Sequence, residues 1–215
     1  DLENYRYYYM IVKDLPVMFT SVTTMIKNTL PTPRALIKWL TEQEDGENEA
    51  KERSDYGTFL HECFGELLIT KQFDLDKMPK KLQQFSAAHK IQYKAEWENP
   101  LKKDLMGLGQ FIIDYNVKPI AIEIILYHPQ DGYAGAIDLV CEMDWEYLGD
   151  HGEVYASGKN KGTPKLTKQI KRINAIVDLK SGKKGFYESH EIQLKAYQQM
   201  WDAHFPDIRV DHLLN

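Results

Sequence analysis

Two stretches in the second half of the chain place a carboxylate next to apolar residues. Asp138 lies inside the apolar run 135–140, and Asp178 ends the run 175–178. Lys180 follows two residues later, so on a strand it leaves the same face as Asp178, with Cα atoms about 6–7 Å apart. Burial of a carboxylate costs free energy unless a cation or hydrogen bonds compensate it. A partly exposed ion pair at a strand end is the alternative explanation for this pair.

If the two strands are neighbours, Asp138 and Asp178 converge and repel each other unless they are protonated or share a cation. A divalent ion bound by carboxylates, carbonyls and water would relieve that repulsion. Mg²⁺ suits an oxygen-rich site, and Mn²⁺ tolerates an added imidazole. The imidazole candidate is His61, which lies four residues after Gly57 on the same helical face. A structural histidine on an amphipathic helix is the alternative.

A third pattern places two polar side chains on one face of the last helix. Gln193 and Tyr197 are separated by four residues, which makes them neighbours on a helix surface. Both side chains can donate hydrogen bonds to a phosphate or hold a neighbouring ligand in place. Mixed helix packing is the alternative.

Charge is distributed unevenly along the chain. The formal net charge is −5, but residues 158–184 contain nine basic residues and a single acid, Asp178. The acidic total argues against a protein that coats nucleic acid non-specifically. The basic segment suits contact with phosphates, and a solvated lysine-rich loop is the alternative. Because two glycines and a proline interrupt residues 158–172, we expect no regular structure there.

The periodicity of apolar residues indicates the elements that position these side chains. We expect helices over residues 34–41, 54–68, 74–95, 98–115 and 187–205, with a further helix start at Ser21. We expect strands over residues 119–127, 133–143 and 173–180, and the beginning of another over 208–215. An acidic, flexible connection (42–51) and a long polar stretch (146–169) link them. This order predicts one α/β domain with helices flanking a central sheet.

In this order, the patterns G-x-x-x-H, G-x-I-D, D-x-K-[ST]-G and Q-x-x-x-Y resemble the PD-(D/E)XK nuclease superfamily. They are most similar to its exonuclease branch, typified by the RecB nuclease domain and phage-type recombination exonucleases. The resemblance covers about residues 54–205. It implies a restriction-endonuclease-like core, a central mixed β-sheet flanked by helices, over residues 54–215. Residues 1–53 would form a helical and extended lead-in packed on this core. The whole chain would be a single domain, truncated at its C-terminus.

The resemblance also implies roles for individual residues. The expected metal ligands, for Mg²⁺ or Mn²⁺, are His61, Asp138, Asp178 and the carbonyl of Leu179. The expected catalytic residues are Asp138, Asp178, Lys180, Glu123, Gln193 and Tyr197, with Lys180 orienting or deprotonating the attacking water. The expected DNA contacts are Lys159, Lys161, Lys165, Lys168, Lys183 and Lys184. Two departures from the family pattern are Ile137 in place of proline and Asp178 in place of the more usual glutamate.

These roles imply a Mg²⁺- or Mn²⁺-dependent deoxyribonuclease that acts in phage or prophage recombination or DNA processing. Similarity to the exonuclease branch implies that it is an exonuclease. Its partners would be DNA and a single-strand annealing protein. Two cysteines are too few for a four-cysteine iron–sulfur cluster and suggest the reducing cytoplasm. No apolar run is long enough to span a membrane, so no membrane partner is expected. The alternatives are a catalytically silent nucleic-acid-binding module on the same fold and a metal hydrolase of small phosphate esters.

Overall fold

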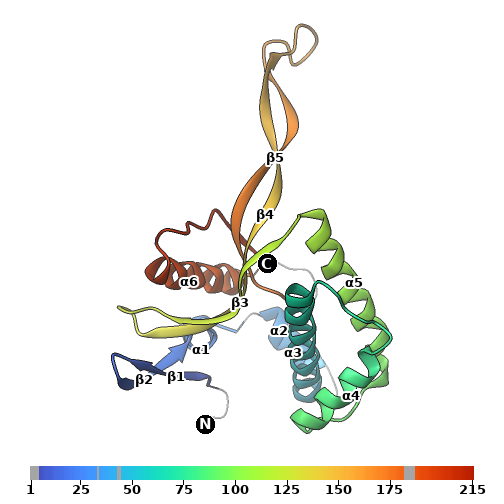
Figure 1. Cartoon of the computed structure of the whole chain (residues 1–215), viewed down its shortest axis with the longest axis vertical. Coiled ribbons are helices and arrows are strands. Elements are labelled where there is room, and N and C mark those ends of the chain that lie inside the picture. Colours follow the sequence, from blue (N-terminus) through green and yellow to red (C-terminus); the bar gives the residue numbers. More distant parts are fainter. Residues whose placement is uncertain (1–4, 33, 43–44, 182–186) are drawn as a thin grey trace.

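The structure, a computed structural model, describes residues 5–32, 34–42, 45–181 and 187–215. Its helices are α1 (Val22–Thr29), α2 (Arg34–Glu42), α3 (Gly46–Thr70), α4 (Met78–His89), the short 3₁₀ helix η1 (Ala95–Trp97), α5 (Glu98–Asp114) and α6 (Glu188–His204). Its strands are β1 (Tyr7–Val12), β2 (Leu15–Ser21), β3 (Lys118–Tyr127), β4 (Tyr133–Val154), β5 (Pro164–Val177) and β6 (His212–Leu214). Figure 1 shows their arrangement.

The strands of the described residues form one mixed sheet of six strands in the order β1-β2-β4-β5-β6, with β3 paired to β4. Antiparallel pairing joins β1 to β2, β3 to β4 and β4 to β5. Parallel pairing joins β2 to β4 and β5 to β6. Strand β4 is therefore the centre of the fold, since it contacts three neighbours along its length. The expected α/β architecture with a central mixed sheet flanked by helices is confirmed.

Helices cover both faces of this sheet (Figure 1). On one face, α6 packs its buried residues Tyr197, Met200 and Trp201 against Ile137 of β4. On the other face, Phe64 and other residues of α3 pack against the opposite side of β4 and β5, together with α5. A separate apolar cluster joins α3, α4 and α5 to one another. The site described below lies between α3 and α6, at the level where β5 ends.

Helix α1 begins where the sequence predicted, whereas α3 and α4 have other bounds than expected. The side chain of Ser21 accepts a hydrogen bond from the Thr24 amide and so caps α1, as the helix start at Ser21 suggested. Helix α3 begins at Gly46, so part of the acidic stretch expected to be a flexible connection is helical. The helix expected over residues 74–95 is shorter, because α4 ends at His89, where Lys90 adopts a left-handed conformation.

The largest correction concerns the long polar stretch. Instead of an irregular loop, β4 and β5 continue as an antiparallel hairpin, paired from Leu139↔Val177 out to Val154↔Pro164. We call residues 146–170 of this hairpin the arm, which projects away from the body of the molecule in Figure 1. Only the tip, residues 155–163, lies outside the two strands. The expectation of no regular structure over residues 158–172 is therefore wrong for residues 164–172.

Candidate metal and catalytic site

Asp138 lies where strand β4 changes the faces to which its side chains point. Ile137 packs with the α6 cluster, whereas Leu139 packs with the α3 cluster on the opposite face. Strict alternation would place both on the same face, because they are two residues apart. The alternation therefore breaks at Asp138, which lies between them and is 9% exposed. This break frees its carboxylate from either apolar cluster.

Strand β3 has the same irregularity opposite Asp138. Ile122 pairs with Leu139 and Ile124 pairs with Ile137, so Glu123 lies across from Asp138. Glu123 has a φ of 50°, the left-handed region that L-residues with side chains rarely adopt. Such a conformation costs of order 1–3 kcal/mol and persists where the surrounding structure imposes it. The strain turns Glu123 toward the same space as Asp138.

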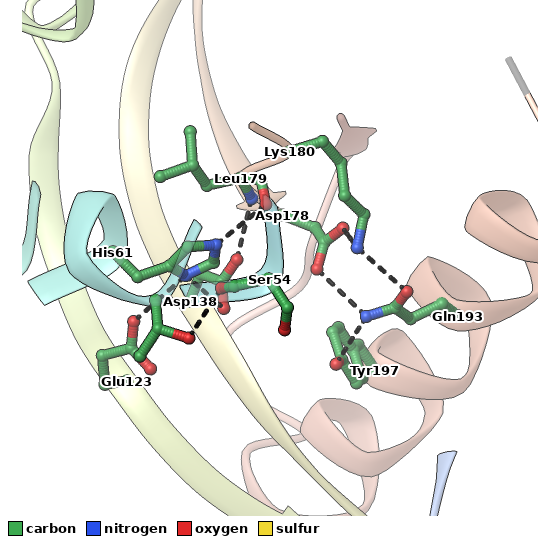
Figure 2. A network of polar contacts seen from close by, with 10 residues as sticks. Ser54, His61, Glu123, Asp138, Asp178, Leu179, Lys180, Gln193 and Tyr197 are labelled. Atoms are coloured by element: carbon green, nitrogen blue, oxygen red, sulfur yellow. Dashed lines mark hydrogen bonds and ion pairs between the residues drawn. The ribbon is translucent and has the colours of Figure 1, made fainter. Parts of the chain in front are cut away.

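His61 on α3 completes a three-residue cluster with these carboxylates. Its Nδ1 atom lies 3.6 Å from Oε1 of Glu123 and 3.5 Å from Oδ1 of Asp138. One possible ligand atom from each of the three residues lies within 4.8 Å of the others. An ion bound at 2.0–2.1 Å holds its ligands about 3–4 Å apart, so small side-chain movements would bring these atoms to a Mg²⁺ or Mn²⁺ ion. Figure 2 shows the cluster beside the end of β5.

The charge state of His61 follows from this setting. Burial opposes the imidazolium and by itself would lower the His61 pKa. Asp138 and Glu123 outweigh this effect through their hydrogen bonds and negative charges, and they raise the His61 pKa to about 10. In the charged form both ring nitrogens donate. Nδ1 then faces the two carboxylates, while Nε2 donates to the carbonyl of Leu179 over 3.0 Å. The carbonyl predicted to be a metal ligand is thus a hydrogen-bond acceptor of His61 in this structure.

The segment after β5 is tied to Asp138 by a second bond. The Leu179 amide donates to Oδ2 of Asp138 over 2.8 Å. Asp138 therefore faces His61 with one carboxylate oxygen and the backbone of residue 179 with the other. This bond fixes the position of the backbone between Asp178 and Lys180.

Asp178 and Lys180 form the second half of the site. Their side chains lie on the same side, as the two-residue spacing predicted, and make an ion pair of 2.6 Å between Lys180 Nζ and Asp178 Oδ2. Gln193 on α6 holds both, because its amide donates to Asp178 Oδ1 over 3.1 Å and its oxygen accepts from Lys180 over 3.1 Å. The same amide donates to the hydroxyl of Tyr197 over 2.7 Å. Figure 2 shows this network opposite His61.

Asp178 is 3% exposed, and burial raises its pKa. The ammonium of Lys180 opposes this rise, and the charge of Asp138 adds to it. Its Oδ2 is buried and pairs with the Lys180 ammonium at 2.6 Å. A carboxylate oxygen paired with one cation keeps a second lone pair that can face another. The oxygen-rich donor set with one imidazole therefore fits Mg²⁺ or Mn²⁺.

Gly57 explains how closely α3 approaches the segment that follows β5. A Cβ atom at this position would lie 2.8 Å from Oγ of Ser181, which follows Lys180 directly. The close approach suggested by a glycine inside this helix is confirmed, and the group that approaches is the hydroxyl of Ser181. Sequence reasoning did not identify Ser181 as the neighbour of Gly57, because that contact depends on the relative placement of α3 and the segment after β5.

A cleft of about 640 Å³ between α3 and β3 opens beside His61 and Glu123. Its other lining residues are Thr58, Glu62, Gly65, Glu66, Ile69, Thr70 and Ile122. The cleft was not predicted, since it arises where a helix and a strand distant in sequence meet. Its carboxylates oppose a phosphate unless a bound cation compensates them.

The lysines expected to contact DNA divide into three groups. Lys159 and Lys161 lie at the tip of the arm and have no carboxylate partner among the described residues. Lys165 and Lys168 lie on β5 and form ion pairs with Glu153 and Glu146. Lys183 and Lys184 lie outside the described residues.

Neither the models of known protein families nor the curated proteins searched contain a match to this sequence. Within the described residues, no helix combines the length and apolar character needed to cross a membrane. Cys63 and Cys141 are free and buried in apolar clusters on separate elements.

Proposed function

We propose that this chain is a metal-dependent deoxyribonuclease with a restriction-endonuclease-like core. The observation that carries the proposal is the junction at Leu179. Through its amide and carbonyl, this residue joins the His61–Glu123–Asp138 cluster to the Lys180–Asp178 pair. A group of potential metal ligands and a paired ammonium therefore lie on either side of one short backbone segment. Hydrolysis of a phosphodiester uses both kinds of group.

His61, Glu123 and Asp138 would hold the ion. Asp178, which was expected to be a further ligand, lies outside this group and is paired with Lys180 and Gln193. When bound, the ion supplies positive charge that polarises the phosphate and makes water more acidic. The chain's own contribution is to keep these ligands oriented before substrate arrives. The Leu179 amide fixes Asp138, and the strained backbone of Glu123 directs the second carboxylate to the same space.

Lys180 supplies charge where negative charge accumulates on the phosphate during hydrolysis. An ammonium group has three donors. One faces Asp178 and one faces Gln193, which leaves a third for a phosphate oxygen. The side chain is 34% exposed, so substrate can reach it. Gln193 and Tyr197 act indirectly, by holding Lys180 and Asp178.

The arm offers a surface for DNA outside the site. Lys159 and Lys161 at its tip lie free of carboxylates among the described residues and suit contacts with phosphates that do not depend on sequence. Ion pairing of Lys165 and Lys168 with glutamates reduces their share of this attraction. We assign the DNA contacts of the arm chiefly to its tip.

The proposal is tested by incubating purified protein and its Lys180→Ala variant with linear DNA, circular DNA and a small phosphodiester, with Mg²⁺, Mn²⁺ or a chelator. We expect metal-dependent cleavage of DNA by the wild type and a loss of about 100-fold or more in Lys180→Ala. Degradation of linear but not circular DNA would assign exonuclease action. Binding of DNA without cleavage would indicate the silent binding module, and turnover of the small ester alone would indicate a different hydrolase.

A further inference from the structure

Gly135 on β4 lies directly beneath the aromatic ring of Tyr197. A Cβ atom at position 135 would lie 2.7 Å from Cε1 and 3.4 Å from Cδ1 of that ring, and 3.2 Å from Cε of Met200. Glycine weakens a strand interior, and it often marks a place where another group approaches the backbone closely. Here the group that approaches is an aromatic ring of α6.

The ring above Gly135 has little freedom to move away. Tyr197 is 4% exposed and belongs to the main apolar cluster, together with Met200 and Trp201. Carbon atoms in contact lie about 3.5–4.0 Å apart, so an added methyl group would require a shift of about 1 Å. Because protein interiors are close-packed, that shift would pass to the rest of the Tyr197 side chain.

The hydroxyl of Tyr197 is the first member of a chain of contacts that reaches the catalytic ammonium. It accepts a hydrogen bond from Gln193, whose amide also donates to Asp178 and whose oxygen accepts from Lys180. Gly135 lies only three residues before Asp138 on the same strand. One short piece of β4 therefore presents a candidate metal ligand and, through Gly135, determines how closely α6 and its Gln193 approach.

We propose that Gly135 is a positioning residue, which sets the place of the Lys180–Asp178 pair relative to the His61–Glu123–Asp138 cluster through Tyr197 and Gln193. This inference rests on the proposed function for its kinetic consequence. Its structural content, the link from residue 135 to the Gln193 amide, does not depend on catalysis.

The kinetic test is Gly135→Ala. A misplacement of about 1 Å near reacting groups can lower a rate about 100-fold, so we expect kcat to fall about 10- to 100-fold with KM nearly unchanged. Gly107→Ala is the matched control, since an added Cβ at that site on α5 meets nothing within 4 Å. It should leave kcat unchanged. In a Gln193→Ala background, Gly135→Ala should cause no further loss, and additive losses would overturn the proposal.

A spectroscopic test separates this inference from the proposed function. The side-chain amide resonances of Gln193, assigned in metal-free protein by comparison with Gln193→Ala, should shift in Gly135→Ala and stay in place in Gly107→Ala. Unchanged resonances in folded Gly135→Ala would overturn the proposal, even if the wild type cleaves no DNA. If Gly135→Ala does not fold, Tyr197→Phe removes only the hydroxyl. The same Gln193 resonances should then shift, and their constancy would refute the link.

Discussion

The amide of Leu179 donates to Oδ2 of Asp138 over 2.8 Å and so ties the segment after β5 to the middle of β4. Asp138 lies where the side chains of β4 stop alternating between the two faces of the sheet. Leu179 lies between Asp178 and Lys180, just beyond β5. Because the carboxylate accepts this bond, it is held in one orientation before any ligand is present. Loss of the carboxylate would therefore affect the segment that carries Lys180 as well as the candidate metal ligands.

Strain at Glu123 can be measured by comparing two substitutions that remove the same carboxylate. At a φ of 50°, Glu123→Gly should be more stable than Glu123→Ala by about 1 kcal/mol, since glycine adopts the left-handed region without penalty. Chemical denaturation of both variants gives the difference. Glu142, which pairs regularly with Asn174 on β5, is the control. There the order should reverse, with glycine less stable by about 0.5–1 kcal/mol. A Glu123→Ala variant at least as stable as Glu123→Gly would show that Glu123 is unstrained.

Metal binding should depend on pH through His61. The His61 pKa of about 10 in the metal-free protein means that the ring carries a proton at neutral pH, which a bound metal must displace. Displacement of one proton makes the apparent affinity rise about tenfold per pH unit below that pKa. Calorimetric titration with Mn²⁺ at pH 7 and pH 8 should show this increase. In His61→Gln, binding should be weaker and nearly independent of pH over this range. Equal affinities of the wild type at the two pH values would exclude His61 as a ligand.

The same pKa has a consequence for stability. The charged form of His61 is favoured in the folded state, because the ordinary histidine value is 6.5. Its contribution to the stability of the metal-free protein is complete below about pH 6.5 and is lost as the pH rises toward 10. Added metal should therefore stabilise the protein more strongly at the alkaline end of this range.

The tip of the arm should contribute to DNA affinity in a salt-dependent way. Each phosphate contact steepens the plot of log affinity against log salt by about 0.7 to 0.9, so replacing Lys159 and Lys161 with alanine should flatten it by about 1.4 to 1.8. Binding is measured by fluorescence anisotropy with a chelator present, so that cleavage does not interfere. Lys80→Ala combined with Lys103→Ala, on α4 and α5, removes the same charge elsewhere and should change the slope less. Equal effects of the two double variants would show that only net charge matters.

Much of the site could be predicted from the sequence because its chemistry depends on short spacings. Asp178 and Lys180 lie just beyond the end of β5 at Val177, so the strand expected to reach residue 180 is shorter, but their two-residue spacing still brings the two side chains together. A four-residue spacing on a helix brings Tyr197 next to Gln193. The meeting of His61 with Asp138 across 77 residues was expected only from the order of the motifs. The geometry of the structure supports that expectation with a contact of 3.5 Å.

The face change at Asp138 and the left-handed backbone of Glu123 could not be predicted. Ile137 and Leu139 are both apolar, and periodicity does not reveal that they pack on opposite faces. The arm was missed for a related reason. Hydrophobic periodicity reports burial against a core, and Leu148 and Ile170 on the arm are 64% and 73% exposed. Without a buried face, a paired strand has the composition of a polar loop.

The central claim is that the cluster of His61, Glu123 and Asp138 holds a metal ion that works with Lys180. The most direct test is the rate of cleavage of linear duplex DNA as a function of Mg²⁺ concentration, for the wild type and Asp138→Asn. Asparagine keeps an oxygen for the Leu179 amide and loses the negative charge. Mutation of a residue that only hydrogen-bonds to a metal ligand lowers metal affinity or activity about 10- to 100-fold. Loss of a ligand itself should therefore lower the rate at least about 100-fold. Cleavage by the wild type in the presence of chelator, or a near wild-type rate in Asp138→Asn, would contradict the account.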